Sequence, residues 1–110
     1  MKCKQLFCTL LLLVVMEAGA QQASSADTAK VNAMIGQIKA TISQDPEQGL
    51  QMATNAKAYA EKAGYPVGVA TAAKWMGNAS FYLGQHENAL LLWQDALKIF
   101  ESANDKMGQA

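Results

Sequence analysis

Small residues recur at regular intervals between Trp75 and Leu97, and they constrain the fold more than any other feature of this chain. They are Gly77, Gly84, Ala89 and Ala96, spaced seven, five and seven residues apart. Helices that cross at close range need small side chains where their backbones approach and large side chains around them. The segment therefore predicts two amphipathic helices joined by a short turn that contains Gly84.

Helix-start and helix-stop residues predict two more helices nearer the N-terminus. The first has an apolar stripe at helical spacing, made of Val31, Ile35, Ile38 and Ile42. Ser25 or Asp27 is available to cap its start. We expect the second helix to begin at Asp45-Pro46, because an Asp side chain caps a helix and proline is tolerated at its first position. Gly64 should end it in a left-handed conformation.

The other two helices follow from the same signals. The third is expected to open at Tyr65-Pro66 and to end before Gly84. The fourth should cover about residues 87–103, with Asn104 closing it. No segment shows the alternation of polar and apolar residues that is typical of a strand. The predicted fold class is therefore all-α, with four helices in two antiparallel pairs.

The apolar face of the fourth helix is unusually wide. Its main stripe consists of Leu90, Trp93, Leu97 and Phe100. A terminal helix in a repeat array has a polar outer side, because no further helix covers it. We therefore expect either further repeats beyond Ala110, which we favour, or a surface for binding or self-association.

Residues 66–104 resemble one unit of the tetratricopeptide repeat family, a helix–turn–helix module of 34 residues. The matches are two small residues, a turn glycine, an aromatic residue and an Ala-Leu pair. They are Gly77 and Ala89, then Gly84, Trp93, and Ala96 with Leu97. The chain departs from the pattern at Ala73 and Ser80, where the family has aromatic residues, and at Glu101, where it usually has proline.

A more degenerate unit precedes this one, over residues 28–65. An offset of forty residues superposes identical residues, among them Glu47 and Glu87, Leu50 and Leu90, and Ala56 and Ala96. This period is similar to that of the longer variant of the family, which occurs in kinesin light chains and in bacterial signalling proteins. Residues 105–110 would then begin a truncated third unit. The resemblance implies antiparallel helix pairs stacked into a short right-handed α-solenoid.

Residues 1–20 have the layout of a secretory signal peptide. A short basic start precedes an apolar run from Leu6 to Met16, and alanines follow at positions 18 and 20. The run is too short to cross a bilayer, which takes about 20 residues. We expect cleavage near Ala20, a polar lead-in over residues 21–27 and an extracytoplasmic product, periplasmic or secreted. An uncleaved anchor or a buried first helix remains the alternative.

The composition of the mature part excludes several kinds of site. Cys3 and Cys8 both lie in the signal segment, so the exported domain has to be stable without disulfides. All nine basic residues are lysines, which counts against nucleic-acid binding and against bidentate grips on phosphate. His86 is the only histidine and has no cysteine to join it, so we expect neither a metal nor a cofactor.

No pattern of catalytic residues is present. Four glutamates recur with the repeat at helix starts and ends, where the helix dipole and solvation would place them. They are Glu47, Glu61, Glu87 and Glu101. We therefore expect no paired-carboxylate chemistry, no catalytic residue and no enzyme activity.

The resemblance implies instead a ligand-binding groove lined by the first helix of each pair. In the second unit its residues are Thr71, Lys74, Asn78, Phe81 and Tyr82. In the first unit their equivalents are Val31, Met34, Ile38, Thr41 and Ile42. His86, in the turn between the third and fourth helices, stands where the family often has an aromatic residue packed on the pair.

Two functions follow from these features. The first is an exported, non-catalytic scaffold that binds a protein or peptide. The alternative is the N-terminal extracytoplasmic sensory segment of a longer bacterial signal transducer, such as a histidine kinase or a helix-turn-helix regulator. Further repeats followed by an apolar run of about 20 residues and a coiled coil would favour the sensor. Neither function involves a nucleic acid or a stable membrane span in the mature part, and the identity of the partner stays open.

Overall fold

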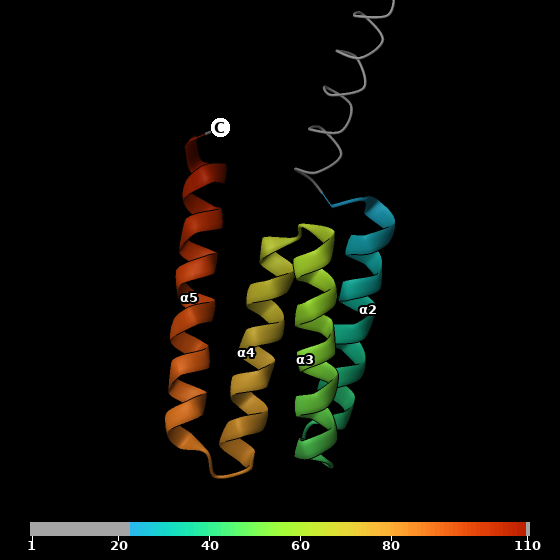
Figure 1. Ribbon diagram of the computed structural model, residues 1–110, viewed down its shortest axis with the longest axis vertical. Helices are drawn as coiled ribbons and strands as arrows, with labels where there is room; N and C mark the ends of the chain where they lie inside the picture. The colour runs from blue at the N-terminus through green and yellow to red at the C-terminus, as the bar shows by residue number, and fades with distance from the viewer. Residues whose placement is uncertain (1–22, 110) are drawn as a thin grey trace, which may run out of the picture.

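The computed structural model describes residues 23–109, with side chains described as far as residue 103. The described residues form four helices and no strand. The helices are α2 (Ser25–Thr41), α3 (Pro46–Ala63), α4 (Pro66–Tyr82) and α5 (His86–Gln109). Consecutive helices lie side by side and run in opposite directions (Figure 1). The predicted all-α class, with helices packed in adjacent pairs, is confirmed. The predicted signal peptide lies outside the described residues.

The start of α2 differs from the prediction. Ser24, and not Ser25 or Asp27, is the N-cap, and its hydroxyl oxygen accepts a hydrogen bond of 3.1 Å from the backbone N–H of Asp27. Asp27 therefore lies in the first turn, where a carboxylate is stabilised by the helix dipole. The helix begins before residue 28, so part of the expected polar lead-in is helical.

The boundaries of α3 agree with the prediction. The Asp45 carboxylate accepts a hydrogen bond of 3.1 Å from the backbone N–H of Gln48, and Pro46 occupies the first turn. At the other end Gly64 adopts a left-handed conformation with φ of 69°, and its N–H bonds back to the carbonyl oxygens of Ala60 and Glu61. These local contacts close both ends of the helix.

The end of α5 does not agree with the prediction. The helix continues through Asn104 to Gln109 instead of closing at Asn104. No glycine or proline occurs between Gly84 and Gly108 to stop it earlier. Asparagine is only a moderate helix breaker, so it ends a helix only where the following chain turns away.

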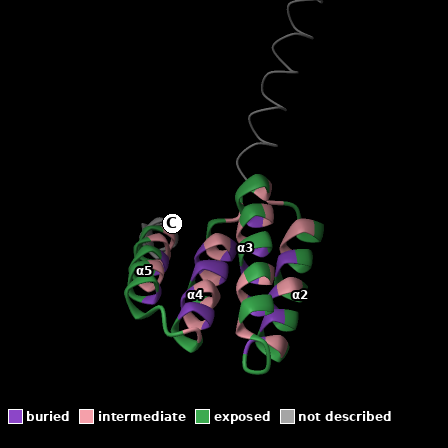
Figure 2. Cartoon of the chain, turned by 60° about the horizontal axis from the view of Figure 1, so that its bottom comes forward, coloured by how far each residue is buried: buried purple, intermediate pink, exposed green. Residues whose placement is uncertain are grey.

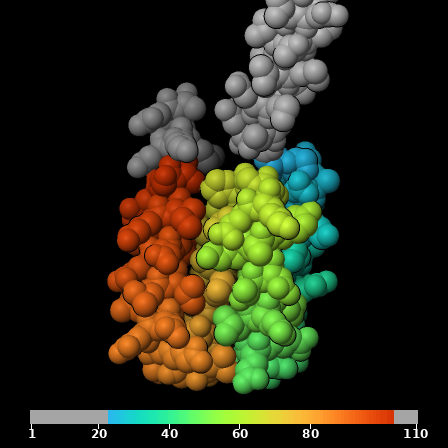
Figure 3. Space-filling view, viewed as in Figure 1, coloured from blue at the N-terminus to red at the C-terminus, as the bar shows by residue number. Residues whose placement is uncertain are grey.

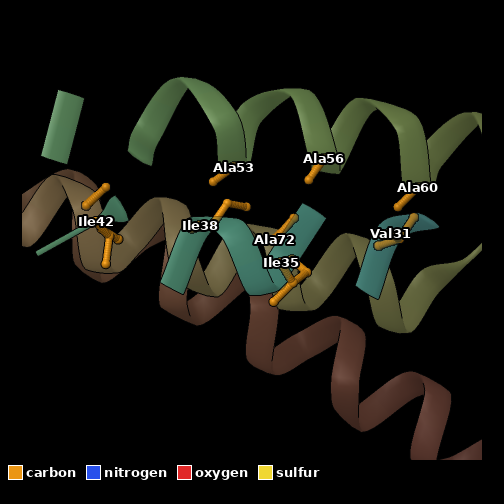
Figure 4. Close-up of a cluster of buried hydrophobic side chains, with 9 residues drawn as sticks. Val31, Ile35, Ile38, Ile42, Ala53, Ala56, Ala60 and Ala72 are labelled. Atoms are coloured by element: carbon orange, nitrogen blue, oxygen red, sulfur yellow. The ribbon is translucent and has the colours of Figure 1, made fainter. Parts of the chain in front are cut away.

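The main core lies where α2 meets α3 and α4. Branched side chains of α2 point at alanines of the two facing helices (Figure 4). The branched residues are Val31, Ile35 and Ile38 of α2 and its C-cap residue Ile42, and the alanines are Ala53, Ala56, Ala60, Ala72 and Ala79. The alanines let the backbones approach, and the branched side chains fill the space between them. Each branched side chain contributes about 1.5–3 kcal/mol by burial.

The second pair has a smaller core. Ala70 and Ala73 of α4 pack against Ala96 of α5, and Ile99 and Phe100 lie partly buried beside them. Buried residues gather on the facing sides of α2, α3 and α4, whereas α5 is mostly exposed or half-buried (Figure 2). This helix has α4 as its main neighbour, so only one of its sides is covered.

The second helix of each pair begins with the same backbone hydrogen bond that the other two helix starts make. The N–H of Gly49 bonds to the carbonyl of Asp45 at 2.9 Å, and forty residues later the N–H of Ala89 bonds to the carbonyl of Gln85 at 3.0 Å. Gly49 and Ala89 are both buried, at the point where each pair closes. In the part of the chain that is described, no helix has the length and apolar character needed to cross a membrane.

Candidate functional site

The five residues predicted for the groove of the second unit all lie on α4. Lys74, Phe81 and Tyr82 are exposed, while Thr71 and Asn78 are half-buried. Their spacing of three to four residues places them along one side of the helix. The hydroxyl of Thr71 is already used, since it donates to the carbonyl of Val67 at 2.7 Å.

The equivalent residues of the first unit do not line a groove. Val31, Ile38 and Ile42 are buried core residues, and Met34 and Thr41 are half-buried. The stripe on α2 that was assigned to ligand binding is instead the side that packs on α3 and α4. This stripe is buried because three branched apolar side chains at helical spacing are stabilised most when all of them are removed from water.

Gly77 provides the space in which the Trp93 side chain lies against α4. A Cβ atom at Gly77 would be 2.5 Å from the indole Nε1 of Trp93. That nitrogen donates to the backbone carbonyl of Lys74 at 3.2 Å and to Oδ1 of Asn78 at 3.0 Å. Trp93 is half-buried, because its helix has another helix on one side only.

Asn78 therefore has a structural contact within the predicted groove. Its amide oxygen accepts from Trp93, which orients the side chain and leaves the amide NH₂ as the group able to donate to a ligand. Among the other residues predicted for helix packing, Ala89 and Ala96 are buried and Gly84 is in the left-handed turn with φ of 82°. Leu97 is 57% exposed, because it lies on a side of α5 that α4 does not cover.

An aromatic cluster joins the end of α4 to the start of α5. The ring of Phe81 meets His86 edge-on with centroids 4.9 Å apart, and it lies 6.0 Å from the ring of Trp93. Tyr82 adds a fourth ring, edge-on to Phe81 at 6.5 Å. Phe81 remains 49% exposed and Tyr82 59% exposed. His86 opens α5 and packs on the pair through its ring.

Trp75 of α4 and Lys39 of α2 lie next to Lys74, and neither was assigned to the site from the sequence. The Nζ atom of Lys39 on α2 lies 5.8 Å from the centroid of the Trp75 ring, and Nζ of Lys74 lies 5.4 Å from it. The indole Nε1 of Trp75 is buried and has no hydrogen-bond partner among the described residues. The adjacency of Lys74 and Trp75 was visible in the sequence, whereas the approach of Lys39 depends on how α2 packs on α4.

A polar contact ties the start of α2 to α3. The hydroxyl of Tyr59 donates to Oδ1 of Asp27 at 2.7 Å, and Nζ of Lys30 lies 4.8 Å from the centroid of the Tyr59 ring. The hydrogen bond from Tyr59, followed by that from the Ser24 hydroxyl, lowers the pKa of Asp27. The same contact with Asp27 raises the pKa of Tyr59. Asp27 is thus held as a carboxylate and used within the fold.

The surface is also hollowed between α3 and α5, above α4 (Figure 3). This pocket has a volume of about 250 Å³ and an apolar floor that includes Val69, Ala73 and Ile99. Lys57, Glu61, Asp95 and Lys98 stand around it. Two cations and two anions leave its rim without a dominant charge.

The exposed side of α4, together with Lys39 of α2, offers hydrogen-bond donors and the faces of aromatic rings. Its polar groups are two ammonium groups, an amide and a phenol, and each of them can donate hydrogen bonds. Within the described residues, no three His, Cys, Asp or Glu side chains lie close enough together to hold a metal ion.

Comparison with protein-family models, with curated proteins and with solved structures finds no match for this chain. The repeat interpretation therefore depends on the residues and on the arrangement of the helices.

Proposed function

We propose that this chain is an exported, non-catalytic scaffold of the tetratricopeptide-repeat type that binds a polypeptide along α4. One observation carries the proposal: the rings of Phe81 and Tyr82 stand about half exposed, next to each other, at the end of that helix. Aromatic rings are rigid and bury much apolar surface with little loss of conformational freedom, so they are typical anchors for a partner chain.

Polar groups along the same helix support this proposal. Lys74 and the amide of Asn78 lie one to two turns before the two rings, and both can donate hydrogen bonds to a peptide backbone or side chain. Polypeptide ligands need a few oriented polar groups beside apolar anchors, because the anchors supply affinity and the polar groups set register. The α4 side offers both over the length of one helix.

Export is the second part of the proposal, and it depends on the sequence of residues 1–20. A basic start, a short apolar run and alanines at positions 18 and 20 are typical of a segment that is removed on secretion. The mature protein should begin at Gln21, which N-terminal sequencing of the product would show. A cytosolic product that still contains Met1 would contradict this part and leave the binding proposal open.

The binding proposal can be tested with peptides selected from a random library on the full chain. We expect Tyr82→Ala to weaken the binding of selected peptides by at least about fivefold, which corresponds to roughly 1 kcal/mol. Leu91→Ala is the matched control, because Leu91 on α5 is also 59% exposed. Phe81→Ala should weaken binding too, but its ring also packs on His86 and Trp93, so its stability has to be measured in parallel.

The competing interpretation is that the two rings pack against a neighbouring repeat. In that case Tyr82→Ala and Leu91→Ala would have equal effects on peptide binding. Equal dissociation constants for the two variants would therefore contradict the binding proposal.

A further inference from the structure

We infer that the exposed side of α5 binds the exposed side of α2 of a second copy of this chain, so that copies associate head to tail. The inference goes beyond the proposed peptide binding, which uses Phe81 and Tyr82 of α4 as anchors. It concerns other residues on other helices, so the two proposals can fail separately.

The first observation is an apolar stripe that α5 leaves uncovered. Leu90 is 53% exposed and Leu97 is 57% exposed, and their spacing of seven residues puts them on one side of the helix. Trp93 and Phe100 extend this stripe and are half-buried. Among the described helices α5 packs on α4 alone, so none of them covers the two leucines. Exposed apolar side chains grouped in this way are typical of a contact surface.

The second observation is the complementary shape of α2, which lies at the opposite end of the row of helices from α5 (Figure 1). The side of α2 that faces away from the core consists of small, exposed residues spaced three and four apart. They are Ala26, Ala29, Ala33, Gly36 and Ala40. Small residues let the backbone of another helix approach, and leucines fill the space beside it. The chain's own core pairs branched side chains with alanines in the same way.

The third observation is that the two helices have opposite charge. α2 contains two lysines and one acid, whereas α5 as far as residue 103 contains one lysine and three acids. The lysines of α2 flank its small residues, because Nζ of Lys30 lies over Tyr59 of α3 and Nζ of Lys39 lies over Trp75 of α4. Pairing α5 with α5 would bring like charges together. The charges therefore favour α5 against α2.

The dimensions of the two sides indicate a weak interface that repeats. The stripe of α5 from Leu90 to Phe100 extends over about 15 Å, and the small residues of α2 over about 21 Å. One helix packed on one helix gives an interface at the small end of the observed range, so we expect a dissociation constant of roughly 1 µM to 1 mM. Each copy in a pair keeps one free α2 or α5, and association therefore continues into rods or closes into rings.

Two variants of the full chain, each blocking one side, test the inference. Leu97→Glu places a carboxylate in the stripe of α5, and Ala33→Glu places one among the small residues of α2. Both positions are exposed, so the fold should be retained, which circular dichroism checks. A carboxylate without a partner is costly to bury in an apolar contact. Each variant alone should associate at least about tenfold more weakly than the unmodified chain in sedimentation velocity.

An equal mixture of the two variants gives the sharper result. One intact α5 then meets one intact α2, while the two substituted sides both contain Glu and repel each other. We expect the mixture to form a dimer and no larger species. The unmodified chain should form species that grow steadily as its concentration is raised from about 10 µM to 1 mM.

Two control variants add the same charge elsewhere. Leu91→Glu alters a leucine of α5 that is 59% exposed but lies outside the stripe, and Gln51→Glu alters an exposed residue of α3. Both should associate within a factor of about two of the unmodified chain. The apolar run of residues 6–16 is the same in every variant, so it does not contribute to the differences between them.

Three results would overturn the inference. The first is an unmodified chain that stays monomeric over the whole range, which would leave the leucines to a different partner. The second is a mixture no heavier than either variant alone. The third is Ala33→Glu that associates as strongly as the unmodified chain, which would indicate pairing of α5 with α5. The effect of Tyr82→Ala on selected peptides is measured separately, so the binding proposal would stand in each case.

Discussion

Gly77→Ala should destabilise the protein although it places a better helix former in the middle of α4. Alanine is favoured over glycine in a helix by about 0.8–1.0 kcal/mol. The added Cβ, however, would lie 2.5 Å from Nε1 and 2.6 Å from Cδ1 of Trp93. An indole ring cannot bend away from such a contact, so the whole side chain has to move.

The cost of that movement can be worked from the contacts of Trp93. Overpacking of a close contact costs about 1–3 kcal/mol. The indole also loses or weakens its hydrogen bonds to the Lys74 carbonyl and to Asn78, each contributing about 0.5–1.5 kcal/mol. After the gain in helix propensity is subtracted, we expect Gly77→Ala to lower the free energy of unfolding by roughly 1–5 kcal/mol.

Gly36→Ala is the matched control. Gly36 lies on the exposed side of α2, and a Cβ there would meet no atom within 4 Å. This variant should raise the free energy of unfolding by about 0.5–1 kcal/mol. Urea titration followed by the helical circular dichroism signal measures both variants on one scale.

A double-mutant cycle tests whether the cost of Gly77→Ala arises from the contact with Trp93. Trp93→Phe removes the indole nitrogen and part of the ring that meets the new Cβ, so it should reduce the cost of Gly77→Ala. The close approach of Trp93 to Gly77 would be refuted if Gly77→Ala stabilised the protein as much as Gly36→Ala does. Additive effects of Gly77→Ala and Trp93→Phe would refute it as well.

Two further predictions concern the first pair. Gly64→Ala should lower the free energy of unfolding by about 1 kcal/mol in the same titration, because Gly64 has a φ of 69° that L-residues adopt at a cost; an unchanged midpoint would contradict this. Tyr59→Phe removes the hydrogen bond to Asp27, whose folded pKa is lowered while that of Tyr59 is raised. The stabilisation from this bond is therefore lost as pH falls through the folded pKa of Asp27 and as it rises through that of Tyr59, so the difference between the two proteins should be largest between about pH 4 and pH 10. A difference that does not vary with pH would contradict this assignment.

The boundaries of α3 were predictable from the sequence because the groups that set them are local. The Asp45 carboxylate meets an N–H three residues away, and Gly64 needs only its own backbone freedom to bond back to the preceding turn. The apolar stripe that contains Ile38 was visible in the same way, but its burial was not predicted, because Ile38 was assigned to a ligand groove. The all-α class follows from such local signals.

The candidate site was predictable only in part. The spacing of Lys74, Asn78, Phe81 and Tyr82 places them on one side of a helix, and the structure has them there. The resemblance to the repeat family assigned Ile38 and its neighbours on α2 to the groove, although they form the core. Spacing identifies the side of a helix that residues share, but it does not show what that side faces.

The sequence by itself determined where most helices start and stop, because caps, proline and left-handed glycine act through contacts within a few residues. Only the tertiary structure decided which side of each helix is covered. It leaves Trp93 half-buried against Gly77 and exposes Leu97. It also brings Lys39 over the ring of Trp75. These outcomes depend on the angle and distance at which whole helices pack, and residues far apart in the chain set both together.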